Sequence, residues 1–379
     1  LQRLINMLYN YEFINSSSTL IEKKLLDKII IIHMYRCLNQ FYYKKISNIS
    51  SYDLIAVLLS GFILKKNNDK IFDYLDLIIM KQIDTFGMHK SYNILEHSKF
   101  INNLKEIKNI FLFFNFNISK NIEEIIFKMS SILNEYFHFD GSFPLFNGTN
   151  NNYTKTIYES LNKDEYLISR KFSNSNNGIA FYSDKYKKIF FEVVQPNKDK
   201  ISSNLSAGTL SFELSAFNEK IISNCGASES FGKNPEYLRY TAAHSTNVIQ
   251  NTNISEIKEN NPHLKFPQSV TFNSNEDDNY MVFEGSHNGY AKRFSKIIKR
   301  KLQISKKETK IYGEDSIISL KNSNDRTIYH IRFHLYHGIT FSFTNNKKTI
   351  ILKTKNNNMW LFKSDSELVV EDSIIVDRN

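Results

Sequence analysis

Apolar side chains recur every three or four residues through the first part of the chain, from Thr19 to about Tyr136. This spacing places them on one face of a helix, so it predicts a series of amphipathic helices. Two predicted helices open with a hydroxyl side chain followed three residues later by a carboxylate, Thr19 with Glu22 and Ser50 with Asp53, which is typical of a helix start. Short turns between the helices predict antiparallel hairpins, and hence an α-helical bundle or a fragment of an α/α toroid.

The second part of the chain alternates apolar and polar residues instead. In residues 209–215, Leu210, Phe212 and Leu214 fall on one side and the polar residues between them fall on the other. Residues 328–338 alternate in the same way and predict a half-buried strand. Many such strands, separated by turn-rich segments, predict antiparallel sheets packed face to face.

The change of period falls in an Asn- and Thr-rich stretch, residues 148–156, whose side chains compete with the backbone for hydrogen bonds and favour a loop. A chain of 379 residues also exceeds what one hydrophobic core usually organises. We therefore predict an α+β fold in two domains, an α-helical domain of residues 1–150 and an antiparallel β-sandwich domain of residues 160–379. Within the second domain, the Asn-rich stretch 251–279 looks like a long loop.

Charge and composition exclude some classes of function but do not identify one. The net charge of +10 attracts polyanions, which include nucleic acid, an anionic membrane and an acidic glycan. The chain is rich in Lys, Asn and Ile throughout, and this general composition explains the positive charge equally well without any polyanionic partner. Cys37 and Cys225 are the only cysteines, too few for a disulfide framework or a zinc cluster. The longest apolar runs are shorter than the roughly 20 residues of a membrane span, so we expect no transmembrane segment.

Several common functional motifs are missing from the sequence. It contains no phosphate-binding GxxxxGK[ST], no dinucleotide-binding GxGxxG after a strand and no GxSxG of serine hydrolases. The aromatic strings of RNA-binding domains are also absent, so we expect no specific nucleic-acid partner.

Four ordered strings in the second half carry more information: SAGTLSFELS (206–215), RYTAAHSTN (239–247), HNGYAKRF (287–294) and IRFHLYHG (331–338), preceded by DGSFPLFN (140–147). In this order they resemble the heparinase II/III-like polysaccharide lyases. The resemblance implies an α/α toroid followed by a β-sandwich, an acidic polysaccharide as substrate, cleavage by β-elimination, and a periplasmic or cell-envelope location. A glycan-binding protein of the cell envelope with weak or no catalysis is the alternative. Nonspecific nucleic-acid binding through the net charge is a third.

Elimination next to a uronic acid requires a group that neutralises the carboxylate, a base and an acid. In the helical half, GMHKSYNILEH (87–97) resembles a family segment that contributes an active-site residue, which suggests catalytic roles for His89 and Tyr92 and substrate binding for Asn93. The family's proline would fall at Ile94, and no tyrosine follows it. The alternative is a loop whose polar side chains cap the next helix.

In the β half, His244 matches a histidine of the family and is our third catalytic candidate; a structural histidine is the alternative. Related lyases carry histidines just before the SFELS strand, where this chain has Asn204 and Ser206. Imidazole and carboxylate are suitable metal ligands, but His244 and Glu213 alone do not make a site, so we predict no metal and no cofactor.

Three further residues of the β half are candidates for substrate binding: Arg239, Arg293 and His334. Arginine binds carboxylate or sulfate through two parallel hydrogen bonds, which lysine cannot reproduce. Charged residues that alternate along a strand are, alternatively, its solvated face.

Overall fold

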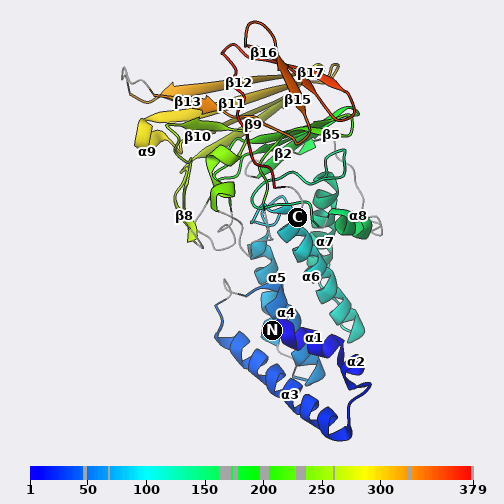
Figure 1. Cartoon of the computed structure of the whole chain (residues 1–379). Coiled ribbons are helices and arrows are strands. Elements are labelled where there is room, and N and C mark those ends of the chain that lie inside the picture. The colour runs from blue at the N-terminus through cyan, green and yellow to red at the C-terminus, as the bar shows by residue number, and fades with distance from the viewer. Residues whose placement is uncertain are drawn as a thin grey trace. The chain divides into compact units, whose positions relative to one another are not determined.

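The computed structural model describes residues 1–45, 49–66, 69–152, 154–161, 172–173, 178–196, 205–227, 236–258, 261–321 and 327–376. The chain forms two compact units, one of Leu1–His89 with His97–Ile132 and the other of Lys90–Glu96 with Leu133–Asn379. Helices dominate the N-terminal part and antiparallel sheets the C-terminal part (Figure 1). The domain boundary predicted near residue 150 stays a prediction.

The first unit is helical. It contains α1 (Gln2–Tyr9), α2 (Tyr11–Asn15), α3 (Leu20–Tyr43), α4 (Ser51–Ile63) and α5 (Asp69–Gln82). It also contains the greater part of α6 (Ile94–Phe113) and of α7 (Lys120–Glu135). The capping pairs predicted from the sequence are confirmed: Thr19 accepts the N–H of Glu22, Ser50 accepts that of Asp53, and each carboxylate binds back. Within the described residues, no helix is both long and apolar enough to span a membrane.

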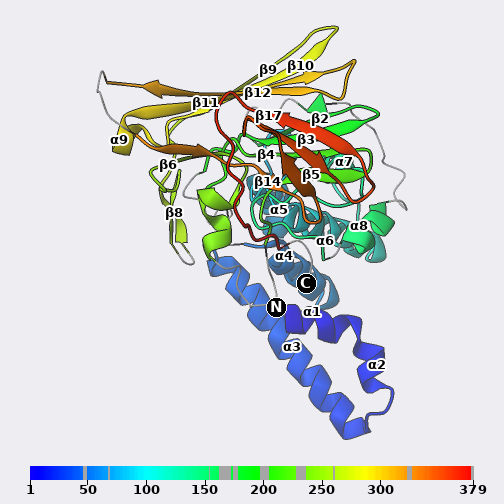
Figure 2. The same ribbon diagram turned by 45° about the horizontal axis from the view of Figure 1, so that its top comes forward.

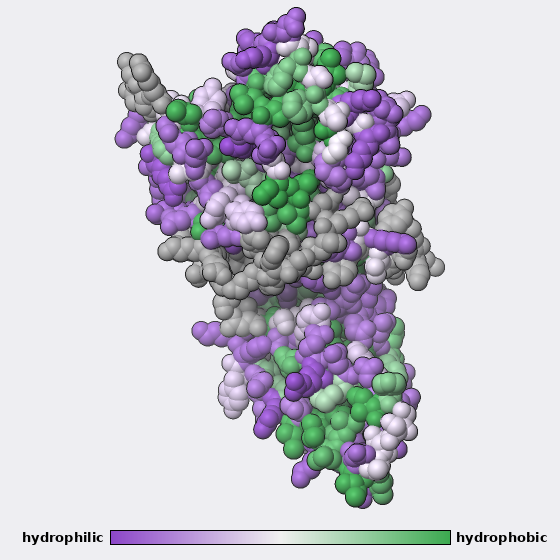
Figure 3. All heavy atoms as spheres, viewed as in Figure 1, coloured by the Kyte–Doolittle hydropathy of each residue, from purple (hydrophilic) through white to green (hydrophobic). Residues whose placement is uncertain are grey.

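Helix α3 is apolar on its solvent side as well as on its buried side. Its buried face includes Ile30, Met34 and Phe41, whereas Ile21 and Leu25 are exposed. Figure 3 shows apolar side chains gathered on the surface over α2 and α3.

The second unit is built on antiparallel sheets, which Figure 2 shows from a second direction. The six-stranded sheet has the order β1 (Phe172–Ser173), β2 (Ile179–Ser183), β3 (Lys187–Glu192), β4 (Phe212–Ala216), β5 (Glu219–Ser223) and β14 (His334–Leu335). The four-stranded sheet has the order β12 (Ile311–Ser319), β11 (Lys296–Ser305), β10 (Tyr280–His287) and β9 (Val270–Glu276). Smaller sheets are β13 (Tyr329–Ile331) with β6 (Asn247–Ile249), β15 (Thr340–Phe343) with β16 (Thr349–Lys353) and β17 (Met359–Lys363), and β7 (Glu256–Lys258) with β8 (Asn261–Lys265). The remaining helical segments are α8 (Thr154–Leu161), α9 (Ala291–Phe294), η3 (Glu236–Arg239) and η4 (Thr241–Ala243).

One hydrophobic core joins the two larger sheets and the sheet of β15–β17. Phe212 and Leu214 of β4 lie in the same cluster as Phe283 of β10 and Leu352 of β16. The rings of Phe191 and Phe283 are stacked with their centroids 6.2 Å apart. The apolar face that alternation predicts for β4 is therefore confirmed.

The polar face of β4 is buried as well. Glu213 and Ser215 are fully buried, and so is Ser211 just before the strand. Strand β4 also begins only at Phe212. A second layer of chain must therefore cover this face of the sheet.

Two expectations from the sequence are wrong. Residues 328–338 form two short strands, β13 and β14, which pair with different partners, β6 and β5. Of the predicted apolar face, Tyr329 and Ile331 are exposed, whereas Phe333 and Leu335 are partly buried against the core. The stretch 251–279, expected to be a loop, contains β7, β8 and all of β9. Alternate residues of β9, such as Val270 and Phe272, pack against the core.

Candidate functional site

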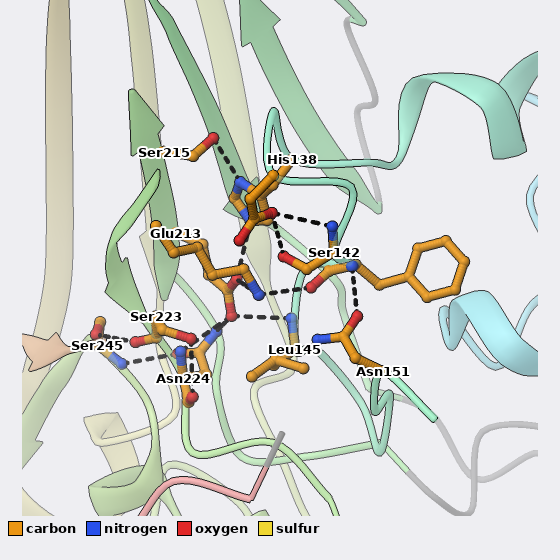
Figure 4. Close-up of polar contacts among 12 residues, drawn as sticks. His138, Ser142, Leu145, Asn151, Glu213, Ser215, Ser223, Asn224 and Ser245 are labelled. Atoms are coloured by element: carbon orange, nitrogen blue, oxygen red, sulfur yellow. Dashed lines mark hydrogen bonds and ion pairs between the residues drawn. The ribbon is translucent and has the colours of Figure 1, made fainter. Parts of the chain in front are cut away.

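The segment after α7 covers the polar face of β4 and meets it through buried charges (Figure 4). The carboxylate of Glu213 accepts the backbone N–H of Leu145 at 2.9 Å and that of Asn224 at 3.0 Å. Its other oxygen lies 3.0 Å from Nε2 of His138 and 3.6 Å from Nζ of Lys220. Lys220 also donates to the carbonyl of Phe143 at 2.7 Å. The two buried charges of the sheet, Glu213 and Lys220, are thus satisfied by each other and by polar groups of the covering segment.

The protonation states follow from burial and pairing. Burial alone would raise the pKa of Glu213, but Lys220 and His138 outweigh it and hold the pKa below its usual value. Burial lowers the pKa of His138, more than its bond to Glu213 raises it. In the neutral ring, Nε2–H donates to Glu213 and Nδ1 accepts from the hydroxyl of Ser215 at 2.8 Å. Both oxygens of Glu213 are therefore engaged within the protein.

Asn147, the last residue of DGSFPLFN, connects three separate stretches of the second unit. It adopts a left-handed backbone conformation, with φ of 51°. Its carbonyl accepts Nδ2–H of Asn93 at 3.0 Å, and its Oδ1 accepts the N–H of Ser206 at 2.9 Å. Its Nδ2 donates to Oε1 of Glu192 at 3.0 Å. The side chain of Asn147 therefore fixes Glu192 relative to Ser206.

Glu192 ends β3 on the same buried face as Glu213, without a charged group bonded to it in the described residues. Its second oxygen accepts the hydroxyl of Ser211 at 3.1 Å. Burial raises the pKa of Glu192 to about 7, although both hydrogen bonds favour the ionised form. Such a carboxyl can gain or lose a proton near neutral pH.

His244 follows η4 and lies beside Glu192. Its ring is 2% exposed, and neither nitrogen has a hydrogen-bond partner within the described residues. Burial lowers the pKa of His244 to about 3, with a further contribution from His334, so the ring is neutral. A Cβ on Gly208 would lie 2.8 Å from Oε2 of Glu192 and 2.9 Å from Cγ of His244. Because real Cβ atoms do not approach so closely, only glycine allows both side chains to occupy this place.

Of the candidates from the helical half, Tyr92 and Asn93 belong to the same unit as His244, whereas His89 belongs to the other. Tyr92 is buried with a φ of 50°. Oδ1 of Asn93 accepts the N–H groups of Leu95 at 2.8 Å and Glu96 at 3.1 Å, so the side chain caps α6, as the alternative interpretation expected.

His89 is buried against Phe100, with ring centroids 5.3 Å apart, and its backbone N–H donates to Nδ1 of His97 at 3.1 Å. The other nitrogen of His97 donates to the carbonyl of Met129 at 2.9 Å. Burial lowers the pKa of His97 to about 3. His97 is thus a structural histidine that fixes the backbone of its neighbour.

The substrate-binding candidates of the β half have different surroundings. Arg239 is buried and donates twice to the carbonyl of Leu205, at 2.9 Å and 3.3 Å. His334 bonds the hydroxyl of Ser373 at 2.8 Å through Nδ1 and the carbonyl of Ala242 at 2.9 Å through Nε2. Arg293 is exposed on α9, 3.8 Å from Glu256. Arg293 is thus the candidate of these three that faces solvent.

The family model described as heparinase II/III-like, C-terminal, matches residues 170–379, more than half of the chain. The chain belongs to this heparinase II/III-like family. No curated protein sequence matches it.

The chain is similar to solved structures of a heparan sulfate lyase and of heparinase III. The heparan sulfate lyase HepC from Pedobacter heparinus has a TM-score of 0.62 and 15% identity, covering 83% of this chain and 52% of that one. The heparinase III BT4657 gene product with methylated lysines has a TM-score of 0.69 and 11% identity, with coverage of 92% and 56%. Another heparinase III structure has a TM-score of 0.64 and 13% identity, with coverage of 82% and 52%. The chain spans about half the length of these structures, and at such identity the likeness shows the fold alone.

This heparinase II/III-like chain places Ser206, not histidine, before its SFELS strand, with its N–H bonded to Asn147. Asn204, the other position of that motif, lies outside the described residues. Among the described residues, no three His, Cys, Asp or Glu side chains come close enough together to hold a metal ion.

Sequence reasoning missed three residues of this heparinase II/III-like site: Asn147, His138 and Glu192. One signal was available for Glu192, since it is a single carboxylate between the apolar residues of FFEVV (190–194). A charged residue in a buried strand needs a partner and so indicates a functional or networked position. Asn147 and His138 lie in irregular backbone, where no period applies.

Proposed function

We propose that the chain is an acidic-polysaccharide lyase that breaks a uronosyl bond by β-elimination and leaves an unsaturated sugar. The observation that carries this proposal is His244, a buried neutral imidazole in the string that matches the family, with no partner for either nitrogen in the described residues. A neutral imidazole has a free lone pair that can take a proton, and with a pKa of about 3 this ring needs a nearby negative charge to hold that proton near pH 7. Family membership and the fold of heparin-type lyases support the reaction class.

In the proposed reaction, His244 takes the proton next to the sugar carboxylate. The electrons of that C–H bond form the C=C bond as the C–O bond to the leaving sugar breaks. Tyr92 protonates the leaving oxygen. His89 is the remaining catalytic candidate, and no proton transfer is assigned to it. Neutralisation of the carboxylate falls to the substrate-binding set, which is Asn93, Arg239, Arg293 and His334. The capping bonds of Asn93 limit its share in this role.

The finer architecture belongs to the same proposal. We place the helices in a fragment of an α/α toroid and the two larger sheets in a β-sandwich. Two observations support this arrangement: the shared hydrophobic core of the sheets, and the coverage of about half of the longer lyase structures.

The test is ultraviolet absorbance of the purified protein with a panel of uronic-acid polysaccharides, because elimination creates a conjugated double bond and hydrolysis does not. Substitution His244→Gln should abolish the absorbance, whereas His330→Gln, a matched change at an exposed histidine, should leave it unchanged. The lyase proposal fails if no polysaccharide gives an unsaturated product, or if His244→Gln retains the full rate.

A glycan-binding protein with weak or no catalysis is the second candidate. It is favoured by the burial of His244, whose 2% exposure leaves little surface for a sugar ring to contact, and by Ser206 in place of histidine. This function predicts saturable binding of an acidic glycan without unsaturated product. Binding that weakens steeply with salt and shows no preference among polyanions would instead indicate nonspecific attraction by the positive charge.

A further inference from the structure

Gly208 lies between two buried titratable side chains. The position of a Cβ on this residue would be 2.8 Å from Oε2 of Glu192 and 3.0 Å from Nδ1 of His244. Since both atoms lie within 3.0 Å of one point, they are at most twice that distance apart. Each of the two side chains is only 2% exposed. A carboxyl and an imidazole thus lie beside each other in the protein interior, where little solvent screens them.

The two side chains are held very differently. The hydrogen bonds from Asn147 and Ser211 occupy both oxygens of Glu192, at 3.0 and 3.1 Å. In contrast, His244 has no such bond at either nitrogen within the described residues. The carboxyl is therefore the fixed member of the pair and the imidazole is the unsatisfied one.

Other charges near the pair are directed elsewhere. Arg239 donates to the carbonyl of Leu205. Arg300 donates to the carbonyls of Leu210 and Ser245 and pairs with Asp315. From β14, His334 approaches His244 and opposes its protonation. A positive charge on His244 would therefore depend on Glu192 for compensation.

We propose that Glu192 is the positioning residue of His244: held by Asn147 and Ser211, it supplies the negative charge that balances the imidazolium when His244 takes a proton. This inference rests on the proposed lyase function for its catalytic part. Glu192 forms no bond with the sugar and does not exchange a proton with it. Opposite charges at this separation in a buried site stabilise each other strongly, so ionised Glu192 favours the protonated ring.

The test that needs no activity is NMR of protein carrying ¹³C at Cε1 of its histidines, with His244 assigned from a His244→Gln sample. In the wild-type protein we expect the His244 signal to show a step near pH 7, because ionisation of Glu192 changes the field at the ring. In Glu192→Gln, which keeps the side-chain shape, that step should be absent. A wild-type His244 signal that is flat through pH 7 overturns the proposal.

Ser211→Ala provides an independent test with Glu192 in place, should the glutamine variant fail to fold. It removes a hydrogen bond to the carboxylate, so the step should move to higher pH, by about half a unit or more. Ser215→Ala is the matched control, since Ser215 lies on the same face of the sheet and bonds His138 instead. A step that stays in place in Ser211→Ala, or moves equally in both variants, contradicts the assignment to Glu192.

Activity separates this proposal from the proposed function. With a cleaved glycan, Glu192→Gln should lower kcat at least tenfold with KM within about threefold, and should change the pH profile near 7. Unchanged kcat and an unchanged profile overturn the positioning role. A wild-type protein that shows the NMR step but eliminates no glycan refutes the lyase function and leaves the charge coupling established.

Discussion

The buried carboxylate of Glu213 offers a quantitative test of how the sheet and its cover are held together. Glu213→Gln keeps the volume of the side chain but replaces a charged group that accepts hydrogen bonds from Leu145 and Asn224 and binds His138. Lys220, fully buried and 3.6 Å away, loses its negative partner. Removing one member of a buried ion pair costs about 3–5 kcal/mol, because the remaining charge is left uncompensated.

At about 2–4 °C per kcal/mol for a domain of this size, we expect the Tm of Glu213→Gln to fall by about 6–20 °C. Differential scanning calorimetry measures this directly. The matched control is Glu308→Gln, at a carboxylate that is 55% exposed and paired with Lys310, which should leave the Tm unchanged. Adding Lys220→Met to Glu213→Gln should recover part of the loss, since it removes the unpaired charge. A fall of less than 2 °C for Glu213→Gln, or no recovery in the double variant, would refute the reasoning.

Four further outcomes are expected. Gly208→Ala should destabilise the protein by about 1–3 kcal/mol in urea unfolding, because the added Cβ meets Glu192 and His244. The control Gly313→Ala, whose Cβ would have its nearest contact at 3.8 Å, should cost little, and equal effects of the two variants would contradict the close packing at Gly208. Arg293→Lys should weaken glycan binding by about 1–3 kcal/mol with an unchanged Tm; lost stability with unchanged affinity would indicate a structural arginine. Stability should fall as the pH drops below about 6.5, because His138, His244 and His287 are buried with lowered pKa values and bind protons mainly when unfolded. Glu192 acts oppositely, since its raised pKa stabilises the fold at low pH and this contribution is lost as the pH rises through about 7. Glu192→Gln should therefore gain stability relative to wild type between pH 5 and 8, and a constant difference would contradict its pKa.

The sequence predicted the features that depend on local rules. The capping pairs at Thr19 and Ser50 mark where α3 and α4 begin, because a cap is set by residues three apart. The apolar face of β4 was also predictable, since it follows from a period of two. Alternation failed at residues 328–338, where the chain changes partner between β13 and β14.

The site was predictable only in part. His244 could be found from a matched string, but its neighbour Glu192 is more than 50 positions away and joins it only through the fold. Asn93 illustrates the converse case: its residue type fits both substrate binding and a helix cap, and the structure shows the cap. The roles of His89 and Tyr92 stay predictions, as do those of Arg239, Arg293 and His334.

The chain that covers the polar face of β4 has a consequence for how this protein can be divided. A fragment that begins at residue 170, where the family match begins, would lack His138, the backbone N–H of Leu145, the carbonyl of Phe143 and the side chain of Asn147. Glu192, Glu213 and Lys220 would then lose hydrogen-bond partners that lie upstream of the cut. The fragment would either expose these side chains to water or fail to fold. Sequence comparison thus marks where relatives can be aligned, while the smallest piece able to fold must reach back at least to the end of α7.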